Sequence, residues 1–324
     1  MDQTDQLQLE IQLRQARKAD IEKRVLDHKN RVDQVKSGIE SRSAQGQGPG
    51  NIPLDFLAIG DSWFEYPIND DGLPAVNQAI PPQLEKMGSP PPLILNLARH
   101  GQASTAVLSW ENQQKILDVL TDPGKTKWTN GKTADGILVS AGGDDIVGDQ
   151  FAIYLDYHGC GLDQARFDGI LASVQASYMD LFALRDVAAE KIGVDPKHIP
   201  IFGHCYDYGI PDGKGATLGG VTISGPWLKP PLDFSGYDYS KGFEIITKAI
   251  TKFYYMLHDL AHDRVTLSGR HTNNFHLVDT RNTITRDEVR PTGWANEIHP
   301  FTEGFAALAH KFLARLQKSF PGRI

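Results

Sequence analysis

Residues 56–64 read Phe-Leu-Ala-Ile-Gly-Asp-Ser-Trp-Phe, a short apolar run that stops at Gly-Asp-Ser. An apolar run of this length, bounded by turn residues, is typical of a buried strand. Gly60 lets the backbone turn at the carboxyl end of that strand, where open α/β sheets hold their ligands. Ser62 would then stand at the mouth of a crevice with its hydroxyl exposed, as a nucleophile requires. Taken alone, Gly-Asp-Ser also fits an ordinary strand-to-loop turn.

A histidine near the other end of the chain favours the chemical interpretation. Residues 296–300 read Asn-Glu-Ile-His-Pro and come just before a last amphipathic segment. Ser62 and His299 are the two parts of an acyl-transfer site that a fold must bring together. Pro300 closes the loop, so the ring of His299 can be held rigidly above Ser62. The alternative is that His299 only caps the last helix.

Strand-like runs alternate with helical periodicity from Asn51 onward, which predicts a parallel sheet with helices on both faces. We therefore expect an α/β domain of three layers, α/β/α, around a flavodoxin-like parallel sheet of about five strands. The stretch from Tyr206 to Ser240 is too rich in Gly and Pro for regular structure, and we expect a long functional loop there. The predicted strands are Leu54–Ile59, Leu93–Ala98, Gly136–Ser140, Ile199–His204 and Phe275–Val278, and the predicted helices are Ala103–Leu120, Ala165–Ile192, Lys241–Ala261 and Thr302–Phe320.

A long polar segment precedes this domain. Residues 1–45 are predicted to form a helix, residues 41–50 a flexible linker, and residues 51–324 the main domain. The helix is either amphipathic and lies on its own domain, or a coiled-coil arm that makes a homo-oligomer through residues 5–40. Because of the linker, the helix need not pack on the domain. Its heptad positions, which we call the seam, are Leu7, Ile11, Arg14, Lys18, Ile21, Val25, His28, Val32, Val35 and Ile39.

The composition excludes several classes of protein. The net charge of −7 argues against nucleic acid as the main partner, because phosphate binding requires basic surface. No apolar run is long enough to span a bilayer, and the N-terminus does not resemble a signal peptide. Cys160 and Cys205 form neither a disulfide framework nor a metal-ligand pattern. We expect a cytoplasmic protein with two buried thiols.

Four segments lie at or just after predicted strand ends, or in the last loop, and together they resemble the blocks of the SGNH hydrolases, also called the GDSL esterase/lipase family. They are Gly60-Asp61-Ser62, residues 96–101 (Asn-Leu-Ala-Arg-His-Gly), Gly142-Gly143-Asp144-Asp145 and residues 296–300. The resemblance covers residues 54–320 and leaves the N-terminal helix outside. The chain contains no Gly-x-Ser-x-Gly elbow, which argues against the common α/β-hydrolase lipase layout.

This resemblance implies roles for individual residues. It makes Ser62 the nucleophile and His299 its base, with oxyanion donors from the backbone N–H groups of Ser62 and Gly101. Asn296 stands where the family has the aspartate that orients the histidine, and an amide oxygen can still accept the Nδ1 proton. The missing charge could come from Glu297 or Asp287. Asp61, Gly143 and Trp63 are further candidate residues of the oxyanion and binding region.

Asp144 stands where the family has an oxyanion-hole asparagine. A carboxylate facing the oxyanion repels it, so activity requires Asp144 to be protonated by burial or turned away. With Asp145 and Asp149 it also forms an acidic group that could hold Mg²⁺ or Ca²⁺, but turn-forming and helix-capping aspartates are the better explanation of the group. We assign no metal site and expect no cofactor.

The predicted function is a serine hydrolase of carboxylic esters that acts through a covalent acyl-enzyme on a small-molecule or lipid ester. The alternatives are a catalytically impaired binding module of the same fold in an oligomeric assembly, a carbohydrate O-deacetylase, and a metal-dependent hydrolase that uses the aspartates.

Overall fold

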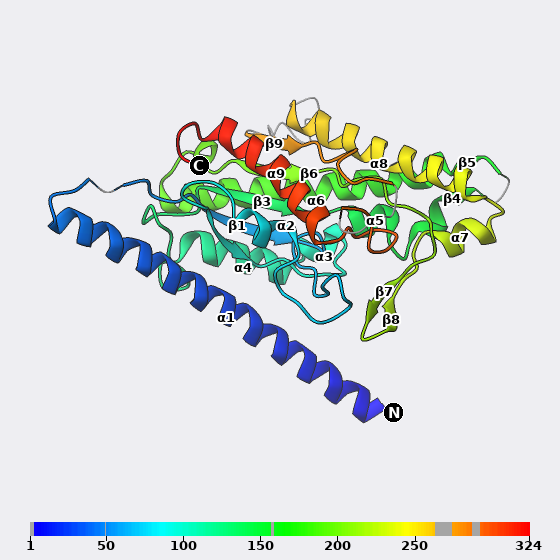
Figure 1. Cartoon of the computed structure of the whole chain (residues 1–324), viewed down its shortest axis with the longest axis horizontal. Helices are drawn as coiled ribbons and strands as arrows, with labels where there is room; N and C mark the ends of the chain where they lie inside the picture. The colour runs from blue at the N-terminus through cyan, green and yellow to red at the C-terminus, as the bar shows by residue number, and fades with distance from the viewer. Residues whose placement is uncertain (1–2, 49, 157–158, 263–273, 287–291) are drawn as a thin grey trace.

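A computed structural model of the chain describes residues 3–48, 50–156, 159–262, 274–286 and 292–324. Its centre is a five-stranded parallel sheet with the order β2-β1-β3-β6-β9 (Figure 1). The strands are β1 (Asp55–Gly60), β2 (Leu93–Asn96), β3 (Gly136–Ser140), β6 (Ile201–His204) and β9 (Phe275–Val278). Counted along the chain this order is 2-1-3-4-5, the flavodoxin-like arrangement that the sequence predicted. The predicted fold class is confirmed.

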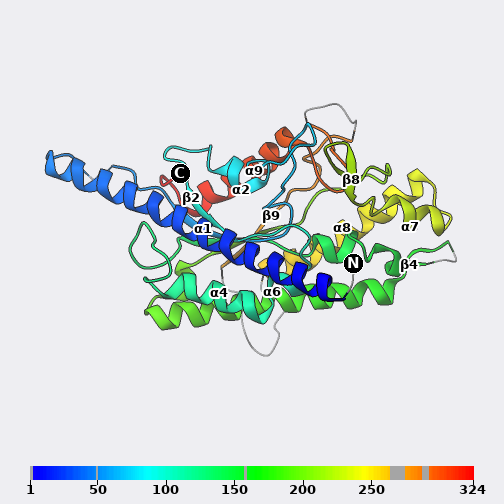
Figure 2. The same ribbon diagram turned by 90° about the horizontal axis from the view of Figure 1, so that it is seen from below.

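Helices cover both faces of the sheet. On one face α2 (Ile80–Leu84) packs against α9 (Thr302–Ser319), and on the opposite face α4 (Trp110–Thr121) packs against α6 (Gln164–Ile192) (Figure 2). The helix α8 (Tyr239–Ala261) packs beside α6. Every residue of β1 and β3 is buried, as expected for strands that helices cover on both faces.

The register brings the carboxyl ends of the central strands to one edge of the sheet. Gly60 pairs with Ser140, and His204 pairs with Val278 at the same edge. Gly60 has a φ of +149°, and a Cβ on it would lie 2.3 Å from the carbonyl oxygen of Ser140. Only glycine can end β1 this close to β3, so the turn that follows is fixed by the strand pairing.

The segment from Tyr206 to Ser240 corrects the sequence prediction. It contains the hairpin of β7 (Ala216–Leu218) and β8 (Val221–Ser224), and the short helix α7 (Lys229–Phe234). The glycine and proline residues lie at the turns of these elements and do not prevent regular structure. The predicted helix Ala103–Leu120 is likewise two helices, α3 (Ser104–Val107) and α4. Unpredicted short elements are α5 (Gly143–Val147), the 3-10 turns Phe151–Tyr154 and Pro196–His198, and the hairpin of β4 (Leu155–Asp156) and β5 (Gly161–Leu162).

The N-terminal helix α1 (Gln3–Ala44) packs on its own domain along β2, and it extends into the predicted linker. His28 and Val32 are fully buried, and the Nε2–H of His28 donates to Asp55 Oδ1 at 2.8 Å. Arg31 donates to the carbonyl oxygen of Ile94 in β2 at 2.8 Å. The expectation that the helix need not pack on the domain is therefore wrong for its second half.

The first half of α1 projects away from the body of the molecule (Figure 1). There Ile11 and the polar seam residues Arg14 and Lys18 are exposed. Oligomerisation through residues 5–40 stays a prediction, and only this half of the seam remains open for it.

Two further sequence predictions can be compared with the structure. Cys205 is buried as expected, whereas Cys160 is exposed. Within the described ranges, no helix has both the length and the apolar character needed to cross a membrane.

Candidate active site

Ser62, His299 and Asn296 form one hydrogen-bonded chain. The Oγ of Ser62 lies 2.6 Å from Nε2 of His299, and Nδ1 of His299 lies 3.0 Å from Oδ1 of Asn296. The amide oxygen of Asn296 can only accept, so Nδ1 of a neutral His299 carries the ring proton and Nε2 is free to accept the Ser62 proton. The structure thus brings together the three residues that the sequence predicted as nucleophile, base and orienting group.

Tyr66 supports the base from a direction that the sequence did not indicate. Its ring stacks on His299 with centroids 4.4 Å apart, and its hydroxyl accepts a hydrogen bond from the Asn296 amide at 3.0 Å. The Oδ1 of Asn296 also accepts hydrogen bonds from the backbone N–H groups of Ile298 and His299. The amide is held from both ends, so the His299 ring has one defined orientation.

Burial sets the protonation state of the base. His299 is 5% exposed, and burial, assisted by the charge of His100, lowers its pKa to about 3. A general base must be unprotonated, so the acid-side loss of activity follows this lowered pKa of His299. We expect kcat/KM for an uncharged ester to remain on its plateau down to about pH 4. Chromatographic measurement of product between pH 3 and 8 checks this, and a midpoint near 6.5 would contradict it.

A buried polar network lies directly behind the nucleophile. Asp61 accepts hydrogen bonds from the Ser140 hydroxyl at 2.6 Å, from the backbone N–H of Trp63 at 3.0 Å and from the Tyr206 hydroxyl. The Nε2–H of His204 in turn donates to the Ser140 hydroxyl at 2.9 Å. Burial raises the pKa of Asp61 to about 6, although these donors oppose the rise. Asp61 therefore holds the turn that carries Ser62, and its oxygens are taken by protein donors.

The sequence missed this network because Ser140 comes from a different segment from His204 and Tyr206, and no spacing relates the two segments. Their common position at or just after the ends of β3 and β6 was the one signal that could have found them.

Two backbone donors and one carboxyl group face the region beside Ser62. Within the described residues, the N–H groups of Ser62 and Gly101 have no hydrogen-bond acceptor in the protein. Gly101 has a φ of +69° and lines the same cavity as Ser62 and His299. Asp144 lines this cavity too, and its Oδ2 atom is buried without a partner among the described residues.

Asp144 is surrounded by conditions that disfavour its charge. Burial, followed by the nearby carboxylates of Asp61, Asp145 and Asp149, raises its pKa well above the usual value. A protonated carboxyl group keeps one O–H donor. The raised pKa favours the carboxylic acid form of Asp144 near Ser62 over the repelling carboxylate.

The structure explains why position 143 is a glycine and position 63 is a tryptophan. A Cβ on Gly143 would lie 2.7 Å from the Tyr206 ring, so the close approach of that ring requires glycine. The indole N–H of Trp63 donates to the carbonyl oxygen of Ile298 at 3.1 Å, and its ring stacks on His204. Trp63 thus ties the turn of the nucleophile to the loop of the base.

Glu297 does not support His299, which corrects one sequence prediction. Its carboxylate accepts the backbone N–H groups of Gly213 and of three residues at the start of α7, at 2.5–3.1 Å. Those three residues are Trp227, Leu228 and Lys229. Asp287, the other suggested source of charge, lies outside the described residues. Asn296 is the described partner of His299 Nδ1.

Within the acidic group of Asp144, Asp145 and Asp149, Asp145 is held by protein contacts. Asp145 accepts the backbone N–H and the hydroxyl of Ser104, at 2.7 and 3.0 Å, and Asp149 is exposed. In the part of the chain that the structure describes, no three His, Cys, Asp or Glu side chains are grouped as a metal site would require.

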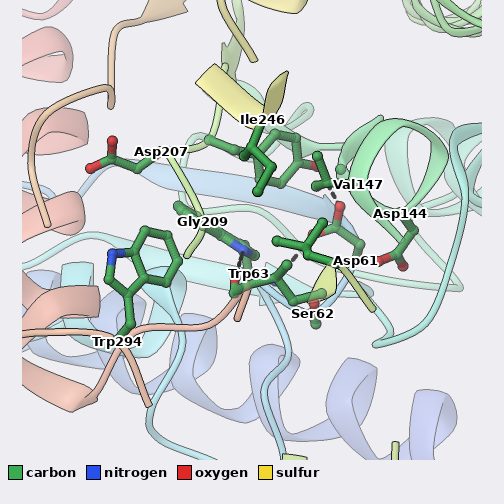
Figure 3. Close-up of a pocket in the computed structure, with 13 residues that line it drawn as sticks. Asp61, Ser62, Trp63, Asp144, Val147, Asp207, Gly209, Ile246 and Trp294 are labelled. Atoms are coloured by element: carbon green, nitrogen blue, oxygen red, sulfur yellow. Dashed lines mark hydrogen bonds between the residues drawn. The ribbon is translucent and has the colours of Figure 1, made fainter. Parts of the chain in front are cut away.

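Two cavities meet at Ser62. The smaller, of about 20 Å³, has room for one water-sized group and lies between Ser62, Asp144, Trp294 and Ile246 (Figure 3). The larger, of about 270 Å³, opens between the turn after β1 and the β7–β8 hairpin. Its apolar lining is Tyr66, Pro67, Ile68, Ala103, Ala216, Ile223, Trp227 and Ile298.

The chain is similar to several solved lipase structures. No protein-family model matches the chain, and no curated protein matches it in sequence. A lipase from a goat rumen metagenome is 14% identical, with a TM-score of 0.48 over 81% of this chain and 96% of the other. A phospholipase A1 from Streptomyces albidoflavus is also 14% identical, with a TM-score of 0.44 over 82% and 99%.

A protein described as a GDSL-like lipase from Bacteroides ovatus is 11% identical, with a TM-score of 0.39 over 84% of this chain and 55% of the other. This last structure carries the name of the class that the four motif blocks resemble.

Proposed function

We propose that the chain is a serine hydrolase of the SGNH type that cleaves carboxylic esters through an acyl-enzyme on Ser62. The observation that carries the proposal is the hydrogen-bonded chain Ser62–His299–Asn296 at the mouth of a cavity. A serine hydroxyl is a poor nucleophile until a base takes its proton, and a neutral His299 is poised to do so.

The reaction follows from these positions. Ser62 Oγ attacks the carbonyl carbon of the ester while His299 Nε2 takes its proton. The resulting oxyanion accepts hydrogen bonds from the backbone N–H groups of Ser62 and Gly101 and from the O–H of Asp144. The bond to the alcohol then breaks, and His299 returns the proton to the departing oxygen. Water, deprotonated by His299, attacks the acyl-enzyme. The bond to Ser62 Oγ then breaks, His299 returns the proton to Ser62, and the acid is released.

Asp144 also supports a second candidate, a catalytically impaired binding module, because an ionised Asp144 would repel the oxyanion. A fluorophosphonate probe separates the two functions, since it labels only an activated serine. Labelling of Ser62, together with hydrolysis of p-nitrophenyl acetate by the full chain, supports the hydrolase. Absence of both supports the binding module.

The cavity sizes support a short acyl group. The smaller cavity has apolar walls from Val147, Leu228, Ile246 and Trp294, and it has room for little more than a methyl group. The larger cavity suits the alcohol part of the ester, including an apolar or sugar-like one. The small size of the cavity assigned to the acyl group favours acetyl esters over long-chain lipid esters.

We therefore expect kcat/KM for p-nitrophenyl esters to fall by about 10-fold or more from acetyl to octanoyl, since one methylene that fits or fails to fit changes the free energy by about 1–3 kcal/mol. Replacing Ile246 with alanine should enlarge the smaller cavity and shift the optimum toward butanoyl. A flat profile, or a preference for octanoyl in the unchanged chain, would contradict the assignment of the acyl group to this cavity.

A further inference from the structure

The N-terminal helix contacts the segment that carries an oxyanion donor. Arg24 of α1 donates to the carbonyl oxygens of Ala98 at 3.1 Å and Asn96 at 3.4 Å, where β2 ends. The same guanidinium forms an ion pair with Glu65 at 3.5 Å. Glu65 lies three residues after Ser62, and its backbone N–H donates to the carbonyl oxygen of Asp61. One arginine therefore joins the turn of the nucleophile to the end of β2.

Glu65 continues this connection to the residue before Gly101. Its Oε2 accepts both the backbone N–H of His100 at 3.0 Å and the ring Nδ1–H of His100 at 2.5 Å. Burial of Glu65 favours its neutral form, but the hydrogen bonds and charge of His100, with the charge of Arg24, lower its pKa overall. Glu65 is thus an ionised acceptor that fixes His100 from two sides.

A second contact fastens the same two segments. The side-chain amide of Asn96 donates to the carbonyl oxygen of Phe64 at 2.8 Å, and its oxygen accepts the backbone N–H of Ala98 at 3.0 Å. The loop from Asn96 to Gly101 is therefore held against the turn of Ser62 at both of its ends. Arg24 is the contribution of the N-terminal helix to this arrangement.

We propose that Arg24 and Glu65 are positioning residues that set the distance between the Gly101 N–H and Ser62, so that the N-terminal helix takes part in hydrolysis. This inference rests on the proposed function, because it requires Gly101 to donate to the oxyanion. An oxyanion donor acts only within about 0.5 Å of its working position. Loss of Arg24 frees the carbonyl oxygens of Asn96 and Ala98 and weakens the hold of Glu65 on His100.

The experiment compares Arg24→Met with Arg31→Met in the full-length chain. Arg31 is a matched control, because it lies on the same helix and donates to β2 at Ile94, away from Ser62. We expect Arg24→Met and Glu65→Gln each to lower kcat for p-nitrophenyl acetate about 10-fold with KM unchanged. Misplacing one oxyanion donor should lower kcat by less than the roughly 10²–10³-fold loss that follows its removal. Arg24→Lys should recover part of kcat, and Arg31→Met should keep kcat even if its melting temperature falls.

The outcomes separate this inference from the proposed function. If the unchanged chain hydrolyses the ester but Arg24→Met keeps its kcat, or Arg31→Met loses as much, the positioning role is wrong and the hydrolase stands. If the unchanged chain neither hydrolyses esters nor reacts with a fluorophosphonate, the proposed function fails and the positioning role fails with it.

Discussion

Replacing Ser62 with alanine is expected to lower kcat for p-nitrophenyl acetate by about 10⁴–10⁶-fold and to abolish labelling by a fluorophosphonate. The hydroxyl 2.6 Å from His299 Nε2 is the group proposed to form the acyl-enzyme, and removing a nucleophile of this kind leaves only the binding and oxyanion contributions. The measurement is steady-state hydrolysis by both proteins, with intact-mass analysis of the labelled serine.

His299→Ala tests whether the two residues act as a unit. Losses of kcat at residues that act together are far from additive. The single variant Ser62→Ala and the double variant Ser62→Ala, His299→Ala should therefore be almost equally inactive. Ser109→Ala serves as the control, because Ser109 lies outside the described hydrogen-bonded chain and both cavities. Equal hydrolysis by Ser62→Ala and the unchanged chain would show that Ser62 is not the nucleophile.

The second large effect is expected at Asp144. Asp144→Ala removes an oxyanion donor and should lower kcat by about 10²–10³. Asp144→Asn keeps a donor of the same shape, so its kcat at pH 7 should stay within about threefold of the unchanged chain. Measurement of kcat for the three proteins at pH 7 decides between a protonated and an ionised Asp144.

The pH profile adds an independent test of Asp144. Burial raises its pKa, so the protonated donor persists at low pH and is lost as pH rises through that raised pKa. The unchanged chain should therefore lose kcat/KM on the alkaline side, whereas Asp144→Asn should not. A strong gain of activity at pH 7 in Asp144→Asn would mean that Asp144 is ionised and disables the site.

Much of this fold could be predicted because the strands are buried on both faces. Runs such as residues 137–139 are apolar at each position, and their alternation with long amphipathic helices specifies a parallel sheet. Gly60, Ser62 and His299 could be found because they follow strand ends or precede the last helix. These are local signals, and the fold then brings distant segments together by topology.

The remaining parts of the site depend on contacts without a local pattern. Tyr66 looks like any loop aromatic until its ring stacks on His299. Glu297 is adjacent to the base loop in sequence, yet its carboxylate faces the start of α7. His28 looked like a polar residue in a coiled-coil seam, although it is the buried partner of Asp55. In each case the deciding partner is more than 25 residues away, where spacing gives no information.

The way α1 is attached also determines when it can acquire its structure. Its contacts join residues 27 to 95 positions apart, from His28–Asp55 to Lys29–Gly124. A polar helix without partners is marginal in water, and its docking surface is made of segments synthesised after it. We therefore expect the first helix in sequence to be among the last elements to become ordered. With Arg24 in its proposed positioning role, the catalytic centre would be complete only once the sheet edge has formed to receive the helix.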